Sequence, residues 1–125
     1  MTAEIDRPEV VAEVRAALAR YNAAIDNRDI ATLKELFWKS DKTVRFGFGE
    51  NLFGHDEISR YRDTAPQNSA PRRVANVVIT TIGNDSAATS VVLERGGGVS
   101  RQSQTWARMP EGWRIVAAHV SVLKT

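Results

Sequence analysis

The sequence contains no cysteine. This absence excludes disulfide bonds, thiolate metal sites and a cysteine nucleophile, and it fits a reducing cytoplasm most simply. Histidine is also scarce: His55 and His119 are the two in the chain, and they stand far apart, in none of the spacings of a metal-binding motif. We therefore predict no metal site.

Membrane and cofactor signals are missing as well. No apolar run approaches the ~18 residues that cross a membrane, and the first ten residues are too polar for a signal peptide. The glycine-rich stretch at residues 47–54 lacks the setting of a dinucleotide fingerprint, and neither a P-loop nor a G-x-S-x-G elbow occurs. We expect a cytoplasmic protein that contacts no membrane, needs no cofactor and has no serine nucleophile.

Charge of one sign is not in large excess. The formal net charge is +2 and the basic residues are scattered along the chain, which argues against nucleic-acid binding. A chain of 125 residues with 42% hydrophobic and 26% charged residues has the composition of an ordinary globular protein. Residues 1–125 are expected to form one domain with its own core.

The N-terminal half contains three predicted helices, at residues 8–26, 30–38 and 55–66. In the first, apolar side chains recur at spacings of three and four, and Pro8 suits the first turn. Asp29 is the expected cap of the second helix and Asp56 that of the third, while Pro66 marks the end of the third.

The hydrophobic period changes to two at residues 43–48, as in a half-buried strand, with Val44 and Phe46 opposite Arg45. Residues 49–54 are expected to turn the chain back. Four longer strands are predicted at residues 72–83, 86–97, 99–109 and 112–125. Helices followed by hairpin-connected strands predict an α+β fold, with the helices on one face of a curved, mostly antiparallel sheet.

The last strand raises a specific question, because His119 interrupts an apolar run. In a regular strand His119 shares a face with Ile115, Ala117 and Ser121. A buried polar group costs about 1–3 kcal/mol unless it is hydrogen-bonded. His119 is therefore expected either to have a structural partner or to line a cavity. Because several strands are apolar on both faces, we also predict a homodimer that buries one sheet face.

Three stretches carry a family resemblance: VRAALARYNAAIDNRD, VRFGFGENLFGHDEI and the ending WRIVAAHVS. Together with the order of helices and strands, they resemble the SnoaL-like members of the nuclear transport factor 2-like superfamily, and more specifically its AtzH-like branch, over residues 5–124. The resemblance implies a cone built from the N-terminal helices and a strongly curved sheet. It also implies that Tyr21 and Arg45 line a pocket in this cone and that His119 reaches into it, so these three are the expected catalytic residues.

Further substrate-binding candidates are Arg45 itself, Arg73, Gln104 and Ser121. Plainer roles are open for three of them: solvent exposure for Arg73, cross-strand hydrogen bonding for Gln104 and a locally paired hydroxyl for Ser121. Trp106, which shares a strand face with Gln104, is expected to pack in the core.

The resemblance implies a small anionic substrate and a cofactor-independent reaction in the catabolism of cyanuric acid and related compounds. That reaction converts 1,3-dicarboxyurea to allophanate, in a pathway that includes an amidase. Two alternatives remain open: a ligand-binding or assembly subunit without chemistry, and an isomerase of the ketosteroid type. The isomerase needs a carboxylate base, for which Asp41 is the nearest candidate.

Overall fold

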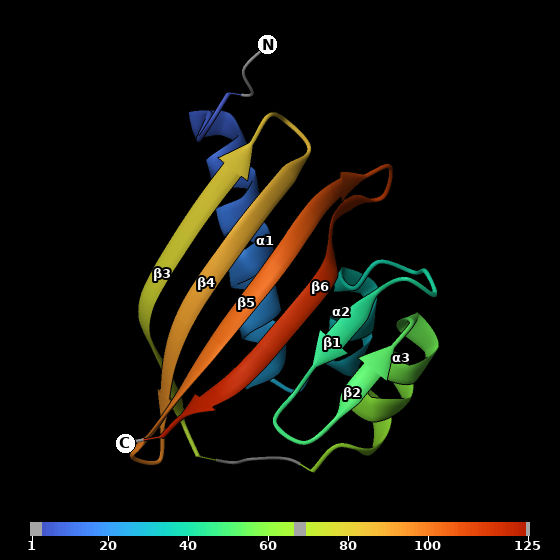
Figure 1. The fold of residues 1–125 in the computed structure, drawn as a ribbon, viewed down its shortest axis with the longest axis vertical. Coiled ribbons are helices and arrows are strands. Elements are labelled where there is room, and N and C mark those ends of the chain that lie inside the picture. The colour runs from blue at the N-terminus through green and yellow to red at the C-terminus, as the bar shows by residue number, and fades with distance from the viewer. Residues whose placement is uncertain (1–3, 67–69, 125) are drawn as a thin grey trace.

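The computed structural model describes residues 4–66 and 70–124, and its ribbon is drawn in Figure 1. The helices are α1 (Pro8–Asp26), α2 (Ile30–Leu36) and α3 (His55–Thr64). The strands are β1 (Val44–Phe46), β2 (Asn51–Phe53), β3 (Arg72–Ile82), β4 (Ser86–Arg95), β5 (Gly98–Met109) and β6 (Gly112–Leu123). They form one sheet in the order β2-β1-β6-β5-β4-β3, in which β1 runs parallel to β6 and all other neighbours are antiparallel. The predicted α+β architecture is confirmed.

Helix α1 crosses one face of the long strands. Figure 1 shows it behind the curved strands β3–β6, and its period of three and four buries Val10, Val14, Leu18, Tyr21 and Ala24. We call the face of the sheet that α1 covers the inner face, and the opposite one the outer face. Among the described residues, no helix has both the length and the apolar character that crossing a membrane requires.

Two predicted helix ends and one predicted cap differ in the structure, and the first of these is the end of α3, which lies at Thr64 and not at residue 66. Asp29 caps α2 as expected, accepting a hydrogen bond from the Thr32 amide at 3.2 Å. The helix ends at Leu36, however, because Phe37 turns to extended backbone and bridges to Ile115 of β6. Asp56 is not the cap of α3: this position is taken by Gly54, whose φ of 86° is a conformation that glycine adopts readily.

The turn predicted at residues 49–54 is wrong in part, because Asn51–Phe53 forms the edge strand β2. Its register places Leu52 beside Arg45 and Asn51 beside Phe46. The hairpin between β1 and β2 is closed by the Gly47 amide, which donates to the Glu50 carbonyl at 2.9 Å. Strand β2 has only three residues, so it carries almost no alternation from which a strand could be predicted.

Strand β6 carries a bulge that changes which side chains face the helices. Thr105 of β5 pairs with Ala117, whereas Trp106 pairs with Ile115, so Val116 is an extra residue in β6. Before the bulge Ile115 points to the inner face; after it Ala118 does. His119 therefore lies on the outer face, contrary to the regular alternation from which its face was predicted.

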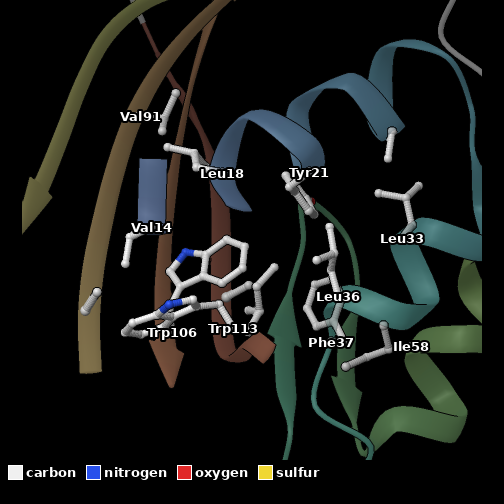
Figure 2. Close-up of a cluster of buried hydrophobic side chains, with 14 of the residues drawn as sticks. Val14, Leu18, Tyr21, Leu33, Leu36, Phe37, Ile58, Val91, Trp106 and Trp113 are labelled. Carbon is white, nitrogen blue, oxygen red and sulfur yellow. The ribbon is translucent and has the colours of Figure 1, made fainter. Parts of the chain in front are cut away.

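The core lies between α1 and the inner face and continues under α2 and α3. Figure 2 shows Trp106 and Trp113 beside Val14 and Leu18, with Tyr21 between this group and the side chains of Leu36, Phe37 and Ile58. Trp106 is completely buried, as predicted, and its Nε1 donates to the Thr89 hydroxyl at 3.1 Å.

Candidate functional site

Strand β1 and Thr43, the residue before it, point their polar side chains inward. Thr43 and Arg45 are buried, whereas Val44 and Phe46 are half-buried on the outer face. The amphipathic pattern is thus reversed relative to the usual strand of a protein core. A buried guanidinium costs much free energy unless other groups compensate it, so the surroundings of Arg45 are informative.

Arg45 is 8% exposed and has one carboxylate partner, Glu50, at 2.9 Å from its Nη1. The ring of Tyr61 lies over its guanidinium, with 4.9 Å from Cζ to the ring centre. Its Nε is buried without a hydrogen-bond acceptor among the described residues. Arg45 therefore keeps a donor that is free for a ligand.

Arg62 of α3 is the second buried guanidinium, also 8% exposed. Its Nη2 donates to the Tyr21 hydroxyl at 3.2 Å, and its Cζ lies 5.9 Å from the ring centres of both Phe37 and Tyr61. Within residues 4–66 and 70–124 no carboxylate forms an ion pair with Arg62. Its Nε is unpaired too. A buried cation that lacks a counterion attracts an anion, because a paired charge costs less to bury than an unpaired one.

Two glutamines of β5 extend this polar region across the sheet. Gln102 and Gln104 are both buried on the inner face, where Gln104 lies beside Ala118 and Gln102 beside Val120. Their Nε2 atoms and the Oε1 of Gln104 have no hydrogen-bond partner in the described part of the chain. Cross-strand hydrogen bonding, one of the roles left open for Gln104, is therefore not what holds it.

We call Tyr21, Arg45, Arg62, Gln102 and Gln104 the inner polar cluster. Its members come from α1, β1, α3 and β5, and it includes two cationic groups against the single carboxylate of Glu50. Burial strengthens the attraction of these groups for an anion, because few waters screen them. The cluster is suited to a small, acceptor-rich, negatively charged ligand.

A surface hollow adjoins the cluster. It is lined by Leu52, Glu57, Arg60, Tyr61, Asp63 and Thr64. Tyr61 contributes to this hollow and at the same time covers the Arg45 guanidinium.

Three of the predicted site residues do not join the cluster. His119 is exposed on the outer face, with its ring 5.8 Å from that of Phe46, and Ser121 lies on the same face because it also follows the bulge. Arg73 is exposed and donates to Glu94 through Nε and Nη2, at 2.9 and 2.6 Å. The expected convergence of His119 with Tyr21 and Arg45 is therefore wrong, whereas Tyr21, Arg45 and Gln104 do face the interior.

The sequence analysis missed Arg62, Gln102 and Glu50. A signal for Arg62 was present, because Arg62 follows Ile58 at a spacing of four and both lie on the buried side of α3. Gln102 stands at period two from Gln104 on the face of Trp106. The local sequence does not indicate that Glu50 contacts Arg45, because it is the turn of the β1–β2 hairpin that brings these two side chains together.

More arginines lie at the far end of the inner face. Arg72 pairs with Asp26 of α1 at 2.8 Å and donates to the Asn22 carbonyl at 3.2 Å. Its neighbour across the strands is Arg95, whose pKa is lowered by burial first and by the Arg72 charge second, while Asp26 acts in the opposite direction. This part of the sheet adds positive charge beside the last turn of α1.

The two remaining candidate residues, His55 and Asp41, are not members of the inner polar cluster. The Nε2 of His55 lies 2.8 Å from the Lys34 carbonyl, which ties α3 to α2, and Asp41 is exposed. In the described ranges no three histidine, aspartate or glutamate side chains gather in the way metal ligands do. Among the residues that the structure describes, no carboxylate is placed in the cluster as an isomerase base except Glu50, and Arg45 neutralises it.

The order of helices and strands, with α1 covering one face of a curved sheet, is that of the nuclear transport factor 2-like class of folds. A protein of this class from Pseudomonas putida KT2440, 17% identical, superimposes with a TM-score of 0.83 over 95% of this chain and 90% of that one. A superfamily member from Salmonella enterica serovar Typhimurium LT2 is 25% identical, with a TM-score of 0.76 over 94% and 93% of the two chains.

Within this class the chain belongs to the AtzH-like family, whose sequence profile matches residues 3–125. It is 48% identical to a Pectobacterium atrosepticum SCRI1043 protein of unknown function from the DUF3225 family, covering 96% and 95% of the two chains with a TM-score of 0.92. It is 38% identical to a cystatin-like fold protein from Burkholderia xenovorans LB400, covering 98% of each chain with a TM-score of 0.92. No curated protein matches the chain. The family and fold inferred from the sequence are confirmed.

Proposed function

We propose that this protein is a cofactor-independent enzyme that removes an N-carboxy group from a small carboxylated urea, with 1,3-dicarboxyurea as substrate and allophanate as product. The observation that carries the proposal is Arg62, a buried cation that has no carboxylate partner among the described residues and donates a hydrogen bond to the Tyr21 hydroxyl. The AtzH-like family membership supports the choice of substrate.

Substrate binding is assigned to the two buried guanidiniums. Both lie against the ring of Tyr61, at 4.9 Å for Arg45 and 5.9 Å for Arg62, so one small molecule can contact both. Dicarboxyurea is planar and carries a carboxylate at each end, and guanidinium groups bind carboxylates through pairs of parallel hydrogen bonds. Each arginine would hold one carboxylate.

The reaction breaks one bond between nitrogen and the terminal carboxyl carbon. By direct loss, the dianion takes up one proton and yields carbon dioxide and the allophanate monoanion. By hydrolysis, the dianion and water yield bicarbonate and allophanate. In both routes the electron pair of the broken bond stays on nitrogen, which must receive a proton. The product keeps one N-carboxy group, so an amidase of the same pathway can consume it.

Tyr21 is assigned the proton transfer. Its hydroxyl oxygen accepts a hydrogen bond from Arg62, so one lone pair is used and the hydroxyl proton remains available for the substrate nitrogen. The same Arg62 stabilises the negative charge that develops on the oxygen as the proton leaves. Arg62 thus binds a carboxylate of the substrate and also stabilises the Tyr21 oxygen. The exposed His119 is assigned no role in the reaction.

Turnover of excess 1,3-dicarboxyurea tests the proposal, with allophanate followed by carbon-13 NMR. Many equivalents of allophanate per chain support an enzyme. Tyr21→Phe should lower kcat roughly 100-fold or more, the scale of one acid–base group, while KM changes little. His119→Ala, on the outer face, should keep full turnover per folded molecule. If the parent shifts its melting temperature with a dicarboxylate but yields no allophanate, the protein is a ligand-binding subunit and the proposed reaction is wrong.

A further inference from the structure

Both polar atoms of the Gln104 side-chain amide need hydrogen-bond partners, and a bound carboxylate can pair with only one of them. Its side chain is on the inner face and the residue is 2% exposed, yet both Nε2 and Oε1 are buried without a partner among the described residues. An unpaired buried polar atom costs about 1–3 kcal/mol. Native proteins rarely keep two such atoms on one side chain unless a ligand or an ordered water pairs with them.

Gln104 is aligned with Arg45 across the sheet. Ala118 of β6 is the register partner of Gln104 on one side and of Arg45 on the other. Because adjacent strands lie about 4.8 Å apart, the Cα atoms of Arg45 and Gln104 are roughly 10 Å apart. The residue between them has only a methyl side chain, so along the sheet nothing larger separates the guanidinium from the amide.

The unpaired atoms of the cluster are of two kinds. The Nε atoms of Arg45 and Arg62 and the Nε2 of Gln102 are all donors. Gln104, whichever way its amide is turned, presents both a donor group, its NH2, and an acceptor, its oxygen. A carboxylate pairs with the donors, but it has no hydrogen to give to the Gln104 acceptor. A ligand that satisfies Gln104 must bring both an N–H or O–H group and a carbonyl-type oxygen.

We infer that Gln104 is a specificity-determining residue that selects ligands with an amide or urea N–H next to the carboxylate bound by Arg45. This rests on the proposed anion-binding function of the cluster and names the group that the ligand must carry besides its charge. An amide N–H and its adjacent carbonyl present one donor and one acceptor, the complement of the Gln104 side chain. A plain dicarboxylate leaves the Gln104 acceptor unpaired and binds more weakly.

A matched pair of ligands isolates this N–H group. N-acetylglycine and levulinate have the same carboxylate and a carbonyl oxygen at the same position, and differ by one N–H replaced with CH2. Isothermal titration calorimetry with the parent protein should show N-acetylglycine binding about tenfold tighter or more, since one unpaired buried acceptor is worth that factor. Gln104→Met, similar in length but without hydrogen bonds, should bind both ligands equally.

Arg45→Met is the control that separates the two claims. It should weaken both ligands by a similar factor and keep their ratio, because the carboxylate is common to them. Equal binding of both ligands to the parent, unchanged in Gln104→Met, would overturn the role of Gln104 while the anion site stands. Failure of the parent to bind either ligand would overturn the anion site and the inference together. If Gln104→Met does not fold, Gln104→Leu is used in its place. The ratio of the two dissociation constants on the parent protein is measured without any variant.

Discussion

The Glu50 carboxylate lies 2.9 Å from the Nη1 of Arg45, and its second oxygen accepts the Gly49 amide at 3.2 Å. An acid from the β1–β2 hairpin thus occupies part of the guanidinium that the proposed substrate needs. A Cβ atom at Gly47 would lie 1.7 Å from the Glu50 Oε1, so glycine at this position leaves the space that the carboxylate fills. A ligand carboxylate must compete with Glu50 for Arg45.

Glu50→Gln should therefore strengthen anion binding. Removing the competing charge frees the Arg45 guanidinium, and a charge-assisted hydrogen bond of about 1.5 kcal/mol corresponds to roughly tenfold in Kd. Titration of a small dicarboxylate such as malonate, followed by calorimetry, measures the change. Weaker binding in the variant would mean that Glu50 positions Arg45 and does not compete with the ligand.

Two further variants control this prediction. Glu94→Gln removes the same charge on the outer face, where Glu94 contacts Arg73, and should leave Kd unchanged. Gly47→Ala keeps the acid but moves its carboxylate, because the added methyl meets the flexible end of Glu50. It should also tighten binding, although the methyl comes within 2.9 Å of the Arg45 Nη1 as well, so the gain is expected to be smaller.

Much of the fold could be predicted because its signals are local. The stripe of α1, the Asp29 cap and the glycine-rich turns between the long strands each act within a few residues. The bulge at Val116 could not be predicted in this way. It is set by the pairing of β6 with β5, which leaves one residue unmatched, and it reversed the face of His119.

The site was predicted only in part for a similar reason. Tyr21 was found on a helix stripe and through the family resemblance, and Arg45 through the resemblance alone. Arg62 was missed although its spacing from Ile58 places it on the buried side of α3, because an arginine at such a position is ordinarily taken for solvent-exposed. Tertiary packing decides whether a polar residue lies inward, and the spacing of residues along one helix or strand carries no information about that packing.

Homodimer formation through the outer face stays a prediction. On this face Val78 is 60% and Phe53 57% exposed, and Phe46 and His119 pack edge to face between them. Val78→Glu should convert a dimer to a monomer, because a charge buried at an apolar contact is costly. Light scattering coupled to size-exclusion chromatography measures the mass.

The control for the dimer prediction is Ile5→Glu, which changes a residue with 58% exposure in the N-terminal segment. It should leave the mass unchanged. A parent protein that elutes as a monomer at micromolar concentration would show that the outer face is not an interface between two copies.

Asp29 should make the stability of the α1–α2 region depend on pH. Hydrogen bonds from the Thr32 hydroxyl first and the Thr32 amide second lower the pKa of this carboxyl. A folded pKa below the unfolded value of about 3.9 means that Asp29 stabilises the fold above that pH, and that the contribution is lost as the pH falls through the folded pKa. Asp29→Ala should melt below the parent at pH 7, and the gap between the two melting temperatures should narrow as the pH falls below about 3.9 and through the lowered pKa of the folded state. A gap that stays constant over this range would contradict the ionic origin of the cap.

Arg62→Met gives the sharpest test of whether the inner polar cluster exists for a ligand. If Arg62 only stabilised the fold, its loss would destabilise the protein. We expect the opposite, because Arg62 is a buried cation without a carboxylate partner among the described residues, and replacing buried charge with an apolar side chain of similar size is often stabilising by about 1 kcal/mol or more. Anion binding should fall at least tenfold at the same time.

The Tyr21 hydroxyl must be included in the Arg62 experiment, because it loses its donor when Arg62 is replaced. The double variant Arg62→Met/Tyr21→Phe leaves neither group unpaired, so its free energy of unfolding should exceed that of Arg62→Met by about 1 kcal/mol. Urea unfolding at pH 7 measures all three proteins, and calorimetry with malonate measures their affinity. A double variant that is less stable than the parent but binds malonate equally well would identify Arg62 and Tyr21 as structural residues and move the ligand site elsewhere.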